Sequence, residues 1–324
     1  MSSDTPTRVR LRVPATSANL GPGFDTFGLA LTLYDEVTVT VPDASGYQDH
    51  SRGYRDDGPL VEVEGEGAGT VPRDRTHLIV RSIDATFEHL ELPGPAGLRI
   101  RCLNRIPHAR GLGSSAAAIA AGVLTARALI PDGTERLPDE EALRLATRLE
   151  GHPDNVAACL LGGLTIAWSA PHPAAVRLEP ADLDLVAYVP DQPMSTEQAR
   201  GLLPPRVPHS DAAANAGRAG LLVGALTGAM TVAPTESAWL VATDDLLHQP
   251  YRAAAMPDSS RLVARLRDAE VPAVISGAGP TVLAFAALED LDDDLTSVPG
   301  FRSFPLRIDR AGTTVEADLD QDTR

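Results

Sequence analysis

Alternating apolar and polar residues predict a β-sheet in the first third of the chain. The period of two occurs over residues 9–13, 37–41, 61–63 and 98–102. Such a period places every second side chain on one buried face. Strands with one polar face favour an antiparallel sheet that helices cover on a single side.

Helical spacing and helix-end signals predict the remaining elements. We expect helices over residues 77–90, 116–128, 138–150, 195–200, 209–230, 235–247 and 259–269. Strands are expected over residues 164–168, 185–189, 273–275, 282–286 and 301–308. Residues 42–59 are polar and predict an exposed loop, and the last ~15 residues form an acidic tail that composition marks as disordered.

The segment Ile106–Ala118 combines glycines, paired hydroxyls and a helix start. Gly111 and Gly113 allow close approach of the main chain to a ligand. Ser114 or Ser115 is expected at the helix N-cap, where unpaired N–H groups and the helix dipole favour an anion such as phosphate. Hydroxyls beside a phosphate can also reach Mg²⁺. The alternative is an ordinary helix start with a small face for close packing.

Two further polar segments interrupt the regular pattern. Residues 14–25 are too rich in glycine and proline for a strand, and we expect a long loop in which Asn19 and Asp25 suit an ammonium or hydroxyl group. The alternative is a plain connector. Residues 150–155 end one helix and begin another, with Asp154 or Asn155 as the expected cap. Glu150 is either functional or a solvated helix end. Residues 276–281 form a second glycine-rich turn.

Composition narrows the class of protein. With 324 residues we expect two domains, divided in the proline-rich stretch 171–180 into residues 1–170 and 171–324. The net charge of −16 argues against nucleic-acid binding, so anionic substrates must be attracted by local arginines. The two cysteines and eight histidines lack metal-site spacing, and the thiols are expected to be buried and free. With no membrane span or signal core, we expect a cytoplasmic protein.

Four motifs occur in a fixed order along the chain. They are PATSANLGPGFD at 14–25, RGLGSSAAA at 110–118, EGHPDNVA at 150–157 and SGAGPT at 276–281. Together they resemble the GHMP small-molecule kinases, and within that family the motif sequences are most similar to those of homoserine kinases. Sequence similarity continues at residues 195–200, 207–209 and 249–252, so the resemblance covers nearly the whole chain. The loop is distinct from the common P-loop because the chain has no lysine.

The resemblance implies a fold and a reaction. The fold would be α+β, the GHMP kinase fold, with a ribosomal-protein-like N-terminal domain and a ferredoxin-like C-terminal domain. The active site would lie in the cleft between them. The reaction would be transfer of the ATP γ-phosphate to the hydroxyl of L-homoserine, a step in threonine synthesis. Homodimers are usual among such enzymes, so we expect one here.

The resemblance also implies roles for particular residues. The ATP phosphates would be bound by Pro107, Arg110, Gly111, Leu112, Gly113, Ser114, Ser115 and Ala116, with Gly277 and Gly279 closing the site. Ser115 and Glu150 would hold Mg²⁺. The amino acid would face Asn19, Asp25, His152 and Asp154, and its carboxylate would meet Arg200 and Arg252.

The resemblance leaves the proton acceptor open. Ser115, Glu150, Asp154 and Asn155 form the expected catalytic set. Mevalonate-type relatives carry an aspartate base where Asn155 stands, and an amide cannot take a proton. We therefore expect the hydroxyl proton to pass to the phosphate or solvent, with Asp25 or Asp154 as an alternative acceptor. Two other functions stay open: a GHMP kinase for another small alcohol, or a ligand sensor of the same fold without turnover.

Overall fold

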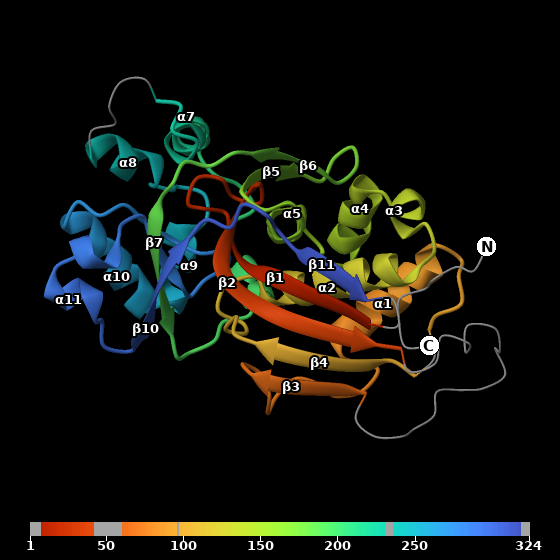
Figure 1. The fold of residues 1–324 in the computed structure, drawn as a ribbon. Helices are drawn as coiled ribbons and strands as arrows, with labels where there is room; N and C mark the ends of the chain where they lie inside the picture. The colour runs from red at the N-terminus through yellow and green to blue at the C-terminus, as the bar shows by residue number, and fades with distance from the viewer. Residues whose placement is uncertain (1–7, 42–59, 96, 231–235, 319–324) are drawn as a thin grey trace.

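The structure is a computed structural model that describes residues 8–41, 60–95, 97–230 and 236–318 (Figure 1). The predicted exposed loop at 42–59 lies outside these residues. Among the residues described, no helix is both long enough and apolar enough to cross a membrane.

A large sheet forms the first part of the molecule. Its main path runs β11 (Thr314–Asp318), β1 (Arg8–Ala18), β2 (Phe27–Thr40), β4 (Arg99–Asn104) and β3 (Val61–Gly65). A hairpin of β5 (Leu164–Trp168) and β6 (Ala174–Leu178) extends the sheet from the start of β2. The pairings are antiparallel, as predicted, except that β3 runs parallel to β4.

Helices cover one face of this sheet (Figure 1). They are α1 (Leu78–His89), α2 (Ser114–Leu129), the short α3 (Gly133–Arg136), α4 (Asp139–Glu150) and α5 (Pro153–Leu161). Small residues make up much of α2, and eleven of its residues are buried between the sheet and its neighbouring helices. The predicted single-sided cover is therefore confirmed, and it places the first turn of α2 at the end of the sheet.

A second sheet and its helices follow. The antiparallel strand order is β10 (Phe301–Arg307), β7 (Asp184–Pro190), β9 (Val282–Ala284) and β8 (Ala273–Ile275). The helices of this part are α6 (Thr196–Gly201), α7 (His209–Leu226), α8 (Glu236–Ala242), α9 (Gln249–Arg252), α10 (Pro257–Asp268) and α11 (Asp293–Thr296). Two short 3₁₀ segments occur at Ala253–Ala255 and Leu288–Asp290.

Three expectations about irregular segments are wrong. β1 continues through Ala18 instead of ending before Pro14, because a shift in register after Pro14 lets the strand keep pairing with β2. The expected linker at 171–180 contains β6, and part of the expected disordered tail forms β11 beside β1. Because β6 and β11 both belong to the first sheet, the domain division at residue 170 stays a proposal.

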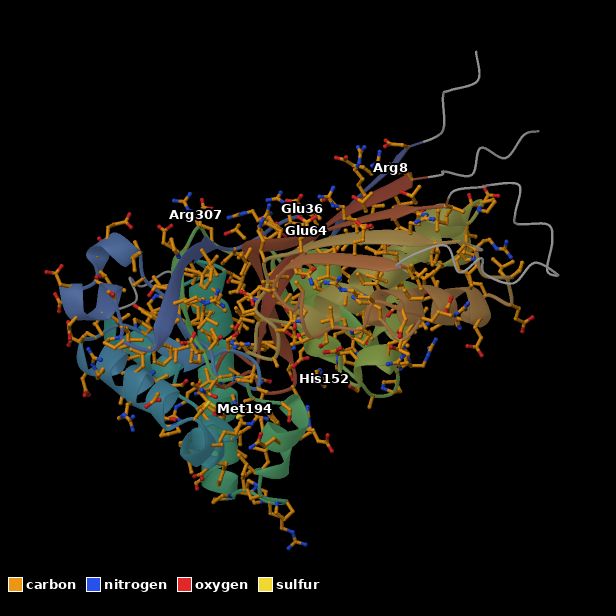
Figure 2. The ribbon with its side chains drawn as sticks, turned by 90° about the horizontal axis from the view of Figure 1, so that it is seen from below. Arg8, Glu36, Glu64, His152, Met194 and Arg307 are labelled. Atoms are coloured by element: carbon orange, nitrogen blue, oxygen red, sulfur yellow. The ribbon has the colours of Figure 1, made fainter. Side chains whose placement is uncertain are left out.

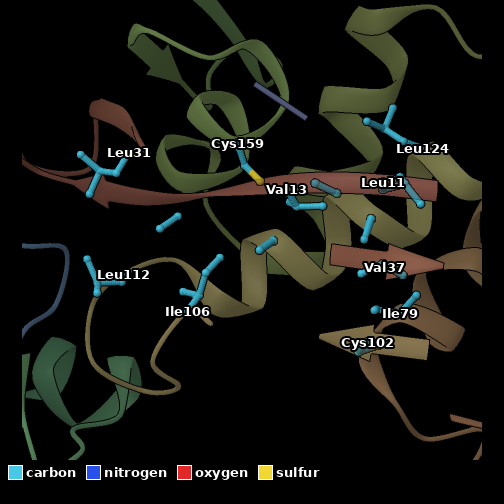
Figure 3. Close-up of a cluster of buried hydrophobic side chains, with 14 of the residues drawn as sticks. Leu11, Val13, Leu31, Val37, Ile79, Cys102, Ile106, Leu112, Leu124 and Cys159 are labelled. Atoms are coloured by element: carbon cyan, nitrogen blue, oxygen red, sulfur yellow. The ribbon is translucent and has the colours of Figure 1, made fainter. Parts of the chain in front are cut away.

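The main core anchors the glycine-rich loop from both sides. Ile106 and Leu112 are fully buried, and Figure 3 shows them at the two ends of this loop among the core side chains. Cys102 and Cys159 lie in the same core as free thiols, as predicted. Burial raises the pKa of both thiols to about 12, so they stay protonated at neutral pH.

Candidate active site

The end of β1 holds two distant loops together. The backbone N–H of Thr16 donates to the carbonyl of Leu112 at 3.1 Å. The Asn19 amide donates to the carbonyl of Gly277 at 2.7 Å. Both side chains, Thr16 and Asn19, are buried. The strand that sequence reasoning ended too early is therefore the element that joins the motifs.

The glycine-rich loop requires its glycines. Gly111 and Gly113 have φ values of +78° and +71°, in the left-handed region that favours glycine. A Cβ on Gly113 would overlap the hydroxyl oxygen of Thr16, and one on Gly111 would overlap the carbonyl of Ser276. These close approaches explain why the loop cannot carry side chains at either position.

Helix α2 begins at Ser114, two residues earlier than expected. Gly113 occupies the N-cap position and makes no side-chain capping bond, so the prediction of Ser114 or Ser115 as cap is wrong. Both serines belong to the first turn, where backbone N–H groups lack partners within the helix. The helix tip and the serine hydroxyls thus face the same opening, the arrangement that binds anions.

A polar cleft of about 70 Å³ lies at this tip and brings most of the predicted residues together. Its lining includes Asn19, Asp25, Arg110, Gly111, Gly113, Ser114, Ser115, Glu150, His152, Asp154, Asn155, Arg200, Arg252, Gly277 and Gly279. Sequence reasoning missed Ala109, Met194 and Ala278, which carry no chemical signal. Figure 2 labels His152 and Met194, which reach the cleft from the two parts of the molecule.

Three predicted residues do not line the cleft. Pro107, Leu112 and Ala116 are buried and are absent from the lining of the cleft. The guanidinium of Arg110 donates to the carbonyls of Pro190, His108 and Asp191. It therefore ties the loop to the end of β7.

Ser115 and Glu150 meet at the mouth of the cleft. The Ser115 hydroxyl donates to Glu150 Oε1 at 2.6 Å. The Glu150 carboxylate is thus engaged by the loop, which does not fit a freely solvated helix end. Burial raises the pKa of Glu150, and the Ser115 hydrogen bond opposes that shift.

A hydrogen-bonded chain follows Glu150. His152 Nδ1 lies 2.9 Å from Asp154 Oδ1, and this hydrogen bond raises the pKa of His152. Pro153 opens α5, so Asp154 and Asn155 fall inside the helix and the prediction that one of them caps it is wrong. The Thr16 hydroxyl donates to Asn155 Oδ1 at 2.7 Å. That bond places the amide oxygen of Asn155 against Thr16, so the NH₂ group of Asn155 points away from Thr16.

Asp25 and Arg200 bind each other across the cleft. The two guanidinium nitrogens Nη1 and Nη2 each lie 2.9 Å from one carboxylate oxygen, a bidentate pair. Asp25 belongs to the first motif, with φ of +54°, and its N–H donates to Asn19 Oδ1. Arg200 belongs to α6. Asp25 and Arg200, which were both expected to face the amino acid, therefore form an ion pair with each other in this structure.

A second cavity, of about 370 Å³, adjoins the loop. Its apolar lining is formed by Val37, Val71, Pro72, Leu78, Ile79, Ala109, Ala117 and Ala118, and its polar lining includes Asp35, Thr76, His77, Arg81, Asn104 and His108. Ser114 and Ser115 line both cavities. Sequence reasoning missed this chamber because most of its walls come from β2, β4, α1 and the residues just before α1, outside the four motifs.

The described residues contain no cluster of three or more His, Cys, Asp or Glu side chains suited to a metal ion. Ser115 and Glu150 nevertheless supply two converging oxygen atoms. Mg²⁺ usually takes one or two protein oxygens and completes its shell with water and substrate phosphates. The donor pair fits Mg²⁺ in that manner.

Comparisons with known proteins show which family the chain belongs to. Residues 77–163 match the model of the GHMP kinases N terminal domain. The chain is 53% identical to a homoserine kinase of Streptomyces coelicolor over 311 residues, which cover 95% of this chain and 94% of that protein. It is 56% identical to a homoserine kinase of Streptomyces avermitilis over 280 residues, covering 86% and 85%.

A solved structure shows the same fold. A homoserine kinase from Cytophaga hutchinsonii is 24% identical and superposes with a TM-score of 0.70, covering 96% of this chain and 98% of that one. This likeness supports the fold, and the two Streptomyces relatives support the family over most of the sequence. The chain belongs to the GHMP kinase family, within its homoserine kinase branch.

Proposed function

We propose that this protein transfers the γ-phosphate of ATP to the hydroxyl of L-homoserine, forming O-phospho-L-homoserine and ADP. The observation that carries the proposal is the meeting of two cavities at the tip of α2. One is a roomy chamber with apolar walls, and the other is a small cleft rich in charge. The homoserine kinase relatives, at 53% and 56% identity, support the choice of acceptor.

The larger chamber takes the adenosine part of ATP. Apolar walls suit a flat base, and the polar side chains among them suit its ring nitrogens and ribose. The phosphates then pass Ser114 and Ser115 into the glycine-rich loop. Partnerless N–H groups of the α2 first turn bind them there without a lysine.

Ser115 and Glu150 hold Mg²⁺. The ion, when bound, neutralises charge on the phosphates and so lowers the cost of phosphoryl transfer. Glu150 must be ionised for this role. Because burial raises its pKa, acidification removes the carboxylate sooner than for an exposed glutamate.

The Asp25–Arg200 pair admits the amino acid by exchange. Homoserine carries an ammonium and a carboxylate, which match the charges of Asp25 and Arg200 respectively. The zwitterion replaces each half of the pair with its own opposite charge, so no charge is left unmatched. Arg252 gives the carboxylate a second cation, and Asn19, His152 and Asp154 complete the cleft.

The chemical step depends on positioning. The hydroxyl oxygen bonds to the γ-phosphorus as the bond between that phosphorus and the bridging oxygen to the β-phosphate breaks, and ADP leaves. The NH₂ group of Asn155 is placed to donate to a hydroxyl and cannot take its proton. Once homoserine replaces Arg200, Asp25 accepts from the substrate ammonium, while Asp154 Oδ1 accepts from the Asn155 N–H and lies 2.9 Å from His152 Nδ1. With both carboxylates engaged in this way, the proton passes to the transferred phosphate or to solvent.

Coupled ADP release across a panel of acceptors tests the proposal. We expect turnover with L-homoserine and little with mevalonate, shikimate or sugar alcohols, with ³¹P NMR detecting the phosphate ester. Turnover with another alcohol alone would make the protein a kinase of different specificity. Binding without turnover would make it a sensor. Cytoplasmic location and a homodimer stay predictions, and light scattering of the purified protein checks the second.

A further inference from the structure

Behind the cleft lies a buried polar cluster of which the reaction described above uses only Arg252. It consists of Asp245, His248 and Arg252, whose exposed fractions are 3%, 0% and 2%. Charged and titratable groups this deeply buried are costly unless each has partners. The partners of His248 show what the cluster does.

Both nitrogens of the His248 ring are engaged, by opposite kinds of group. Arg252 Nη1 lies 3.1 Å from His248 Nδ1, and the Gly21 carbonyl oxygen lies 2.8 Å from Nε2. A guanidinium nitrogen can only donate and a carbonyl can only accept. The ring is therefore uncharged, with its hydrogen on Nε2, and burial lowers the pKa of His248 in the same sense.

The ring is also fixed by its surroundings. It stacks on Phe24 with centroids 5.1 Å apart and an interplanar angle of 23°. Asp245 Oδ2 accepts from the backbone N–H of His248 at 3.0 Å and lies 3.5 Å from Nε2. Gly21 and Phe24 belong to the loop that carries Asp25. One side chain thus bonds to that loop and to Arg252.

We propose that His248 is a positioning residue that sets the substrate-facing edge of Arg252 against the loop bearing Asp25. Arg252 Nε donates to the Ala199 carbonyl at 3.2 Å, and Nη1 donates to His248. These two bonds orient the planar guanidinium, so Nη2 is the edge left to meet a carboxylate. The inference rests on the proposed function, in which Arg252 binds the homoserine carboxylate.

Three substitutions separate the two bonds of the ring. His248→Asn keeps an oxygen close to the position of Nδ1 and so keeps an acceptor for Arg252. His248→Gln keeps an NH₂ group close to Nε2 and so keeps the donor to Gly21. His248→Phe keeps the flat ring beside Phe24 and removes both bonds. Tyr188→Phe is a matched control, because it removes a buried hydrogen bond to the Leu295 carbonyl among the apolar side chains packed on the second sheet.

Steady-state kinetics provide the readout. We expect His248→Phe to raise the homoserine KM by roughly tenfold or more, the order expected for losing a hydrogen bond to a charged group. The KM for ATP should stay close to the wild-type value. His248→Asn should raise the homoserine KM less than His248→Gln, and Tyr188→Phe should leave both constants unchanged.

A substrate without the carboxylate charge sharpens the test. With L-homoserine methyl ester as acceptor, His248→Phe should change the KM much less than with homoserine. An equal rise for acid and ester, or an equal rise for ATP, would overturn the positioning role. If His248→Phe fails to fold, the homoserine KM values of His248→Asn and His248→Gln decide. A KM for His248→Gln equal to or lower than that for His248→Asn would overturn the inference. A wild-type protein inactive on homoserine would refute the proposed function, whereas unchanged variants of an active enzyme would refute this inference alone.

Discussion

Replacing Gly113 by alanine tests how the glycine-rich loop is built. Gly113 has φ of +71°, and a new Cβ would overlap Thr16 Oγ1 and lie 3.1 Å from Asn155 Oδ1. The left-handed backbone costs an alanine about 1–2 kcal/mol. Moving the Thr16 hydroxyl breaks its bond to Asn155, worth about 0.5–1.5 kcal/mol. We therefore expect a loss of about 2–3 kcal/mol in unfolding free energy.

Gly300→Ala is the matched control. Gly300 has φ of +83° and no atom within 4 Å of an added Cβ, so it carries the backbone cost without the overlap. Urea unfolding should show about 1–2 kcal/mol for this variant, and its kcat/KM should stay at the wild-type value. Gly113→Ala should lower kcat/KM by roughly a hundredfold, because a displaced loop misplaces the phosphates and Asn155.

A double-mutant cycle identifies the cause. Thr16→Ala removes the hydroxyl that the new Cβ meets, so the pair of changes should cost less stability than the sum of the single changes. Additive effects, or a Gly113→Ala variant indistinguishable from Gly300→Ala in both stability and activity, would refute the close packing of the loop on β1.

Three further predictions concern the charged groups. Glu150→Gln should lower kcat by roughly a hundredfold, the order for a lost charge-stabilising group, with little change in urea unfolding. Because burial raises the pKa of Glu150, the kcat/KM of the wild-type protein should fall on acidification at a pH above the ordinary glutamate pKa. Equal losses of activity and stability in Glu150→Gln would make Glu150 structural. Arg200→Ala should raise the homoserine KM and change stability by at most about 1 kcal/mol, because its pair with Asp25 is partly exposed; a collapse of ATP affinity instead would place this arginine on the nucleotide. Burial raises the pKa of Asp35 to about 6 from 3.8, so the folded state favours the protonated form, and stability should fall by about 3 kcal/mol as the pH rises from 3.8 through 6. Asp35→Asn should lack that fall in unfolding experiments between pH 4 and 7, and an identical pH slope in the variant would contradict the assignment.

Much of the fold was predictable because its periodic signals are local. The strands Leu164–Trp168 and Ala273–Ile275 begin and end where the pattern places them. The first strand was underestimated because residues 14–18 are proline and small residues, whose extended pairing with β2 depends on a register shift. β11 pairs with β1 from the far end of the chain, and an acidic, exposed sequence gives no sign of such a distant partner.

In the candidate site, too, some features could be predicted from the sequence and others could not. Motif residues such as Ser115 and Asp154 could be predicted as site residues, because glycines, hydroxyls and acids at fixed spacing carry their own signal. They line the same cleft, and their roles stay predictions. Two features depend on three-dimensional packing alone. The chamber proposed for adenosine is lined largely by residues outside the four motifs, and the proposed role of His248 depends on Gly21, which lies far away in the sequence.

A crystal structure with L-homoserine and a non-hydrolysable ATP analogue tests the central claim most directly. The account predicts the triphosphate on the tip of α2 between Gly111 and Ser115, the adenine in the chamber beside Val37 and Ile79, and the carboxylate on Arg200 and Arg252. A nucleotide bound elsewhere, with the Asp25–Arg200 pair still closed, would contradict it.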